Sequence, residues 1–150
     1  MSSINVRLAT PTDAPRIAPL FDAYRQFYEQ APDLVSAQEF IAARLNKQES
    51  IIFIAENELG EAVGFCQCYP SFCSVAAAPI YVLYDLFVSP AVRQSGAGKQ
   101  LMQAAEAHAK ANGIARLDLT TAKDNLKAQS LYTQQGWQRD DVYYAYNKAV

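Results

Sequence analysis

The sequence has few of the residues that metal centres and disulfide frameworks require. It contains one histidine and three cysteines among 150 residues. A structural zinc site uses about four Cys or His ligands, and an odd number of cysteines leaves at least one thiol unpaired. We therefore expect no metal cofactor. The cysteine count also favours the reducing cytosol over an oxidising compartment.

Long apolar runs and a surplus of one charge are also missing. No apolar run approaches the ~20 residues of a membrane span, and residues 1–4 lack the basic and apolar regions of a signal peptide. The 13 Lys and Arg residues nearly balance the 15 Asp and Glu residues and form no basic stripe. Nucleic-acid binding normally needs such a stripe. We expect no membrane and no nucleic-acid partner, and a cytoplasmic location.

What remains is the composition of an ordinary globular protein. Hydrophobic residues make up 51% of the chain and charged residues 19%. A chain of this length can bury roughly two thirds of its unfolded surface around a single core. Neither repeats nor Pro- or Gly-rich linkers divide it. The sequence therefore predicts one domain that covers residues 1–150.

The hydrophobic patterns alternate between the strand period and the helix period. They predict strands near residues 4–8, 51–56, 62–69, 80–88 and 115–119. They predict helices over residues 12–28, 36–45, 98–112 and 124–135. We expect a loop over residues 71–79 and a terminal strand that contains Tyr143, Tyr144 and Tyr146. Because a strand–helix–strand crossover is right-handed, its two strands should be parallel. The fold predicted is α/β, with a mixed, mostly antiparallel sheet of six or seven strands and about four helices.

A glycine-rich loop follows the central strand. It reads Arg93-x-x-Gly96-x-Gly98 and leads into a helix. The first amides of a helix lack partners within the helix and lie at the positive end of its dipole, so this pattern predicts a phosphate-binding loop. Gln100 stands where a Walker loop needs Ser or Thr, and Leu101 where a dinucleotide fingerprint needs its third glycine. A plain turn that packs the helix against the strand remains the alternative.

Together with its surroundings, this loop resembles the GNAT superfamily of acyl-CoA-dependent N-acyltransferases. The resemblance runs from end to end and is carried by the loop, by the Asp85-Leu-Phe-Val strand, and by Asp124-Asn125, Leu131-Tyr132 and Gly136-Trp137. Tyr24-Arg-Gln-Phe-Tyr28 and Tyr69-Pro-Ser-Phe72 further resemble the branch of histone and polyamine acetyltransferases.

The resemblance implies that acetyl-CoA is the cosubstrate. Its pyrophosphate would lie on the backbone amides of residues 94–99, and its pantetheine arm would pair like an extra strand with residues 86–88. Asn125 would contact the CoA arm and Tyr132 would lie near the thioester sulfur. The CoA-binding residues implied are Leu86, Phe87, Val88, Arg93, Gln94, Ser95, Gly96, Ala97, Gly98, Lys99, Asn125, Ala128 and Tyr132. A helix cap remains the alternative for Asn125, and a core aromatic for Tyr132.

The reaction implied is direct attack by a neutral primary amine, of a small molecule or a peptide, on the acetyl carbonyl. The Val88 or Phe87 N–H would stabilise the tetrahedral intermediate, and Tyr132 would protonate the departing thiolate. Many relatives carry Glu where this chain has Tyr84. Strand alternation puts Tyr84 and Asp85 on opposite faces, so only one of them should face the acceptor, and the general base is unassigned.

Three further expectations complete the sequence analysis. The residues expected to contact the acceptor are Tyr24, Tyr28, Tyr84 and Asp85. The resemblance and the tyrosine-rich end of the chain favour a homodimer, since a strand that is apolar on both faces needs cover on both. A noncatalytic acyl-CoA sensor or partner protein is the alternative to an enzyme.

Overall fold

The computed structural model describes residues 3–93 and 95–150. Residues up to Thr120 form one compact unit and Thr121–Val150 a second, and each is described by itself. In the described residues of the first unit, five strands form a sheet in the order β1-β2-β3-β4-β5. The strands are β1 (Asn5–Leu8), β2 (Ile51–Glu56), β3 (Ala62–Cys73), β4 (Ala78–Val88) and β5 (Leu117–Asp118). Neighbouring strands are antiparallel except β4 and β5, which are parallel.

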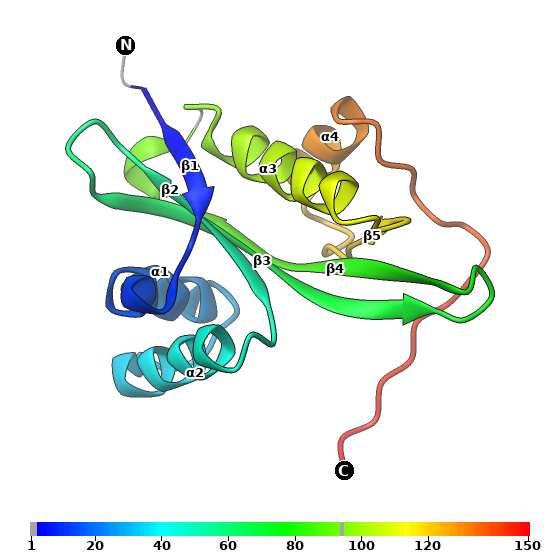
Figure 1. Cartoon of the computed structure of the whole chain (residues 1–150), viewed down its shortest axis with the longest axis horizontal. Coiled ribbons are helices and arrows are strands. Elements are labelled where there is room, and N and C mark those ends of the chain that lie inside the picture. Colours follow the sequence, from blue (N-terminus) through cyan, green and yellow to red (C-terminus); the bar gives the residue numbers. More distant parts are fainter. Residues whose placement is uncertain (1–2, 94) are drawn as a thin grey trace. The chain divides into compact units, whose positions relative to one another are not determined.

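Helices cover both faces of this sheet. Figure 1 shows α1 (Ala14–Phe27) and α2 (Leu34–Asn46) on one face and α3 (Ala97–Ala111) on the other. Short 3-10 turns, η1 (Pro11–Asp13) and η2 (Pro90–Val92), precede α1 and α3. The mixed α/β fold is confirmed, with fewer strands than predicted.

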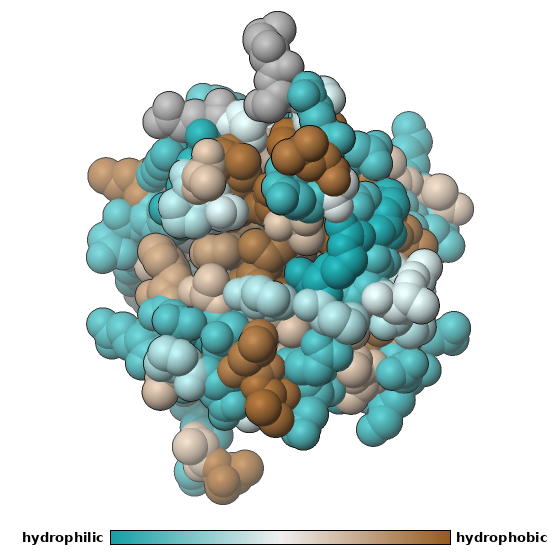
Figure 2. All heavy atoms as spheres, turned by 90° about the vertical axis from the view of Figure 1, so that its left-hand side faces the viewer, coloured by the Kyte–Doolittle hydropathy of each residue, from teal (hydrophilic) through white to brown (hydrophobic). Residues whose placement is uncertain are grey.

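The core lies in two layers, one on each face of the sheet. On the first face, Ile17 and Phe21 of α1 and Ile41 of α2 pack over Phe65, and all four are buried. On the second face, α3 buries Leu101, Met102, Ala105 and Ala109. Full burial of one such large side chain contributes roughly 1.5–3 kcal/mol. Figure 2, which shows the left-hand side of Figure 1, has a mostly hydrophilic surface with separate hydrophobic patches between the hydrophilic residues.

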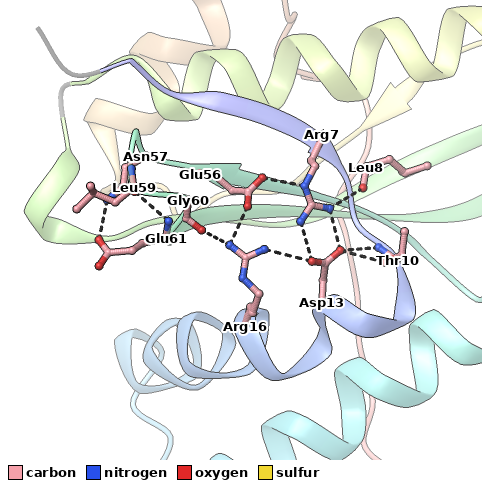
Figure 3. Close-up of polar contacts among 10 residues, drawn as sticks. All are labelled: Arg7, Leu8, Thr10, Asp13, Arg16, Glu56, Asn57, Leu59, Gly60 and Glu61. Carbon is pink, nitrogen blue, oxygen red and sulfur yellow. Dashed lines mark hydrogen bonds and ion pairs between the residues drawn. The ribbon is translucent and has the colours of Figure 1, made fainter.

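A group of ion pairs fastens α1 to the sheet edge (Figure 3). Arg7 donates to both Asp13 oxygens at 2.9 and 2.8 Å, and its Nε donates to Glu56 at 2.8 Å. Arg16 joins the same two carboxylates and donates to the carbonyl of Gly60. The hydrogen bonds from Arg7 hold the pKa of Asp13 well below its usual range. The start of α1 is thereby fixed on β1 and β2.

Several boundaries differ from the predictions by a few residues, and two of the differences have a clear physical reason. The loop predicted over residues 71–79 is wrong, because β3 runs to Cys73 and β4 begins at Ala78. Most residues of this hairpin end are exposed on both strands, so no buried face imposes an alternation that the sequence could reveal. The second helix begins at Leu34 rather than Ser36, because the Asp33 side chain accepts from the Ser36 N–H and caps it.

The second unit contains α4 (Leu126–Gln134), which ends near Gly136 in the left-handed region at φ 87°. Residues 138–150 are exposed, and no strand forms there. The predicted terminal strand is therefore wrong. The tyrosine side chains favour a strand, but a strand also needs a neighbouring strand whose backbone pairs with its N–H and C=O groups. None of the helices in residues 3–93 and 95–150 is both long and apolar enough to span a bilayer.

Candidate functional site

The sheet splits along β4. Its parallel pairing with β5 is confined to Tyr81 opposite Leu117 and Val82 opposite Asp118. Beyond Val82, β4 continues for six residues to Val88 and remains paired with β3 on its other side. No described strand pairs with the far edge of that segment. Residues 83–88 therefore form an edge inside the fold, which we call the open edge.

The hydrogen-bond pattern identifies which amides face the open edge. Ser89 donates to the carbonyl of Val63 at 2.8 Å. Because hydrogen-bonded and non-bonded pairs alternate in an antiparallel ladder, Phe87 also directs its N–H toward β3. Leu86 and Val88 then direct theirs toward the open edge. Of the two predicted oxyanion donors, Val88 directs its N–H toward the open edge and Phe87 does not, and the role of Val88 stays a prediction.

A β-bulge interrupts β4 at the start of the open edge. Gln67 lies opposite Asp85 and Cys68 lies opposite Leu83, so Tyr84 is an extra residue on β4. A bulge breaks the period of two, so alternation no longer separates Tyr84 from Asp85. The Tyr84 ring packs against Tyr69 with centroids 5.5 Å apart, and Tyr69 lies on the same face of β3 as Gln67. The predicted placement of Tyr84 and Asp85 on opposite faces by simple alternation is therefore wrong, and which of them faces the acceptor stays a prediction.

Asp85 is the centre of a buried polar network. Its side chain accepts from Nε2 of Gln67 at 2.7 Å, and Oε1 of Gln67 accepts from Ser50 at 2.8 Å. Gln67 is fully buried and Asp85 is 5% exposed. Burial raises the pKa of Asp85, while hydrogen bonds from Gln67 and from the Tyr24 hydroxyl oppose that rise. Among the described residues, dipoles rather than a cation hold the carboxylate.

Tyrosines surround this carboxylate. The Tyr24 hydroxyl donates to the carbonyl of Tyr84 at 3.4 Å, and its pKa is raised by burial and by the charge of Asp85. The ring of Tyr28 meets that of Tyr24 edge-on, with centroids 5.2 Å apart. Tyr28 and Tyr84 are 51% and 67% exposed. The four residues predicted to contact the acceptor thus lie close together. Tyr28 and Tyr84 are exposed, and Asp85 is buried below the surface.

The glycine-rich loop lies at the end of the open edge. Gly96 is the N-cap of α3 and has φ 86°, a left-handed conformation that suits glycine. Having no side chain, it cannot cap the helix itself. The first turn contains no acidic residue, and Ala97 donates to Oγ of Ser95 at 3.3 Å. Arg93 donates from Nε to the carbonyl of Val88 at 3.3 Å, which links the loop to the strand. Gln94, also predicted to bind CoA, lies outside the described residues.

Residues 17–137 match the model of the acetyltransferase (GNAT) family. The chain belongs to this family. Its fold is therefore that of a GNAT acetyltransferase, as the sequence resemblance implied.

Relatives of this GNAT chain agree with the assignment. It is 50% identical over 146 residues to the uncharacterized N-acetyltransferase YhfO of Bacillus subtilis, covering 96% of this chain and 97% of that protein. A crystal structure of a probable acetyltransferase matches with a TM-score of 0.91 and 31% identity over 97% of each chain. An aminoglycoside N-acetyltransferase in complex with CoA matches with a TM-score of 0.82 and 20% identity, over 100% and 97% of the two chains. That last likeness is one of fold. The histone and polyamine branch stays a prediction.

The remaining predicted GNAT residues belong to the second unit. The Asn125 side chain accepts from the Ala128 N–H at 3.3 Å and caps α4. The cap that was the alternative for Asn125 is therefore present, and its contact with CoA stays a prediction. Tyr132 lies half-buried on α4 with its ring 6.3 Å from that of Trp137, and its role as general acid also stays a prediction.

Sequence reasoning missed Gln67 and Ser50, and it noted Tyr69 only for a branch resemblance. A signal for Gln67 was present, because it interrupts the apolar run Phe65-Cys66-x-Cys68 on the partner strand. A polar residue there must be buried and hydrogen-bonded. Its partner was not predictable, since the pairing of Gln67 with Asp85 depends on the bulge.

Proposed function

We propose that this acetyltransferase transfers the acetyl group of acetyl-CoA to a primary amine of a small molecule or peptide by direct attack. The observation that carries the proposal is the continuity between the open edge of β4 and the glycine-led start of α3. Pantetheine amides can complete an exposed strand edge as an added peptide does. A pyrophosphate can then accept from first-turn amides at the end of that edge. The two features follow one another in the order that CoA requires.

The loop has room for such an anion. A Cβ placed on Gly96 would have no described heavy atom within 4 Å, so the space beside its backbone is open. The glycine is needed for its positive φ rather than to relieve crowding within the protein. Lys99 adds a positive charge in the first turn, and Arg93 brings a second to the same loop.

The chemistry proposed uses backbone groups for the acyl carbonyl and side chains for protons. The Val88 N–H stabilises the oxyanion that develops on the carbonyl. Tyr132 protonates the thiolate that leaves. A free thiol of pKa ~8.5 is already a tolerable leaving group near neutral pH, so Tyr132→Phe should lower kcat by less than the ~100-fold at the lower end for general acids, with CoA affinity nearly unchanged.

The test is calorimetric binding of CoA and acetyl-CoA, followed by thiol release with a panel of amines. Wild-type protein should bind CoA and release thiol with at least one primary amine. Gly96→Val should weaken CoA binding at least tenfold, because a β-branched residue in the left-handed region strains the loop by about 1–3 kcal/mol. Gly113→Val is the matched control, since Gly113 has φ 70° just beyond the other end of α3 and similar open space.

Both glycine variants should lose comparable stability, but only Gly96→Val should lose affinity. Wild-type protein that binds no CoA at millimolar concentration would contradict the proposal. Protein that binds acetyl-CoA yet releases thiol with no amine would instead support the alternative, an acyl-CoA sensor.

We also propose a homodimer. Tyr143, Tyr144 and Tyr146 are 81–93% exposed, and aromatic residues are characteristic of protein interfaces. Light scattering at tens of micromolar should give twice the mass of one chain. Replacing the three tyrosines with serine should weaken the dimer, whereas a monomeric wild type would contradict it.

A cytosolic location is proposed for the same protein. Cys66, Cys68 and Cys73 are all free, and the first two are buried. Free thiols of this kind persist in a reducing compartment. Fractionation of cells that produce the protein should find it with cytosolic markers.

A further inference from the structure

We propose that Asp85 takes the proton from the ammonium group of the acceptor, and that the tyrosines around it select a cationic primary amine. This inference rests on the proposed function and deepens it. It assigns the general base that the sequence leaves open and restricts the acceptor to amines that are protonated when they bind.

The position of Asp85 on the strand supports the assignment. The β4–β5 pairing ends at Val82, the bulge is at Tyr84, and Asp85 follows immediately. Leu86, the next residue, directs its N–H toward the open edge. Strand residues advance ~3.3 Å each, so Asp85 lies one residue from Leu86 and three residues, roughly 10 Å along the strand, from the Val88 N–H. The bulge thus lies where the sheet splits and directly beside Asp85, the only acidic residue predicted to contact the acceptor.

The charge balance around Asp85 points to a cationic ligand. Among the described residues, Gln67 of β3 and Tyr24 of α1 hydrogen-bond the Asp85 carboxylate. Its charge acts on Tyr69 and on the buried thiol of Cys66, both on β3, and Tyr84 precedes it on β4. Arg44 and Glu49 are the charged groups that act on this cluster, and they act on Tyr69 with opposite signs. Arg44 is engaged with Glu49 at 3.1 Å and lies 4.4 Å over the Phe40 ring. A buried carboxylate without a cation is costly, and an ammonium ligand supplies the missing charge.

The tyrosines fit the same ligand. Tyr84, next to the acid in the chain, and Tyr28, packed on the Tyr24 ring, each expose more than half of their surface. Ring faces attract ammonium groups through their quadrupole, by about 0.5–1 kcal/mol at exposed sites. Their hydroxyls add acceptors for the remaining ammonium hydrogens. An ammonium nitrogen on an aliphatic body can therefore rest between the rings with one N–H aimed at the carboxylate.

The proton transfers balance. The acceptor R–NH3+ gives one proton to the Asp85 carboxylate, which becomes the acid, and R–NH2 keeps the lone pair that attacks the acetyl carbonyl. The C–N bond forms and the C–S bond breaks. The second nitrogen proton leaves as the amide forms and is matched by protonation of the thiolate. Asp85 then releases its proton to solvent, so one proton is released per turnover.

The first experiment compares Asp85→Asn with wild type on two primary amines. One is a simple alkylamine, with an ammonium pKa of about 10. The other is a fluorinated amine whose ammonium pKa lies below the assay pH, so that it arrives neutral. Asp85→Asn should lower kcat/KM for the alkylamine by ~100-fold or more and for the fluorinated amine by less than tenfold. Calorimetry should give unchanged CoA affinity. Glu39→Gln, an exposed carboxylate on α2, is the matched control and should change neither rate.

The second experiment uses wild-type protein alone, so it does not depend on the variant folding. With the alkylamine, kcat/KM should fall on the acidic side with a limb that belongs to Asp85. With the fluorinated amine, the fall should follow the pKa of the amine itself. Equal losses for both amines in Asp85→Asn, or the same acidic limb for both in wild type, would overturn the inference. Absence of turnover with every amine would instead remove the proposed function.

Discussion

Two buried aspartates in the first unit have opposite electrostatic surroundings. Asp13 is 4% exposed and Asp85 is 5% exposed. Asp13 meets Arg7 and Arg16, and its pKa is lowered. Asp85 meets Gln67 and Tyr24, and its pKa is raised by burial. Burial alone therefore says little about role. An acid whose charge is balanced within the chain stabilises the fold, whereas one left without a cation costs stability and is available for a ligand.

The largest effect expected from this contrast is at Asp13. Asp13→Asn should lower the free energy of unfolding by about 2–3 kcal/mol, the scale of lost hydrogen bonds between charged groups. The expected loss of stability is no larger than this, because Arg7 is 37% exposed and solvent screens part of its interaction with Asp13. Urea unfolding at neutral pH measures it. Asp118→Asn is the control, because its pair with Arg116 is exposed, and it should leave stability nearly unchanged. Equal losses of stability in Asp13→Asn and Asp118→Asn would contradict the claim that the buried ion pairs of Asp13 stabilise the fold more than an exposed pair does.

A smaller effect of opposite sign is expected at Asp85. Asp85→Asn should raise the free energy of unfolding at neutral pH by about 1 kcal/mol, as substitutions of strained active-site groups commonly do. The amide keeps an oxygen for Gln67 to donate to, and it cannot ionise. Thermal unfolding at pH 7 measures the difference. A variant less stable than wild type at that pH would show that the carboxylate stabilises the fold as Asp13 does.

The pH dependence of these two differences should run in opposite directions. The folded-state pKa of Asp85 lies above its unfolded value of about 3.9, so its ionisation weakens folding as the pH rises above ~4. The advantage of Asp85→Asn should therefore shrink to zero near pH 4. The folded-state pKa of Asp13 is lowered, so its contribution is complete above ~4 and is lost as the pH falls below that value. Unfolding curves from pH 3 to 8 would separate the two.

The smallest expected effect concerns Tyr24. Its hydroxyl lowers the pKa of Asp85, so Tyr24→Phe should raise that pKa further and move the acidic limb of kcat/KM up by a fraction of a pH unit. Stability should change little, because the ring keeps its contacts with Phe21 and Phe65. Tyr28→Phe is the matched control, since the Tyr28 hydroxyl is not among the groups that set the pKa of Asp85. The same shift in both variants would exclude a specific role for Tyr24.

The sequence predicts best what depends on neighbouring residues. The loop before α3 is readable because a left-handed cap needs glycine at Gly96 whatever the rest of the chain does. The parallel β4–β5 pair follows from the handedness of one crossover. Spacing alone also placed Ile17 and Phe21 of α1 on one buried face, whereas Phe27 and Tyr28, predicted on that face, are exposed at the end of the helix.

Features that depend on a distant partner were not predictable. The hydrogen bond from Gln67 to Asp85 requires the exact register of β3 on β4, and one extra residue at Tyr84 changes that register. The exposed end of the β3–β4 hairpin carries no alternation. The terminal tyrosines have the composition of a strand, but the described chain gives them no strand to pair with.

The open edge has a consequence for the protein before it meets any substrate. An unpaired strand edge is a template on which another chain can add itself, and proteins usually blunt such edges. In this protein, a structure that permanently covered the open edge would also cover the amides of Leu86 and Val88, which the proposed function needs. Under the proposed function, bound acyl-CoA covers the template whenever the cell supplies it. Starvation for acyl-CoA would therefore leave the protein idle and also make it more prone to aggregate, which links its lifetime to the supply of its own cosubstrate.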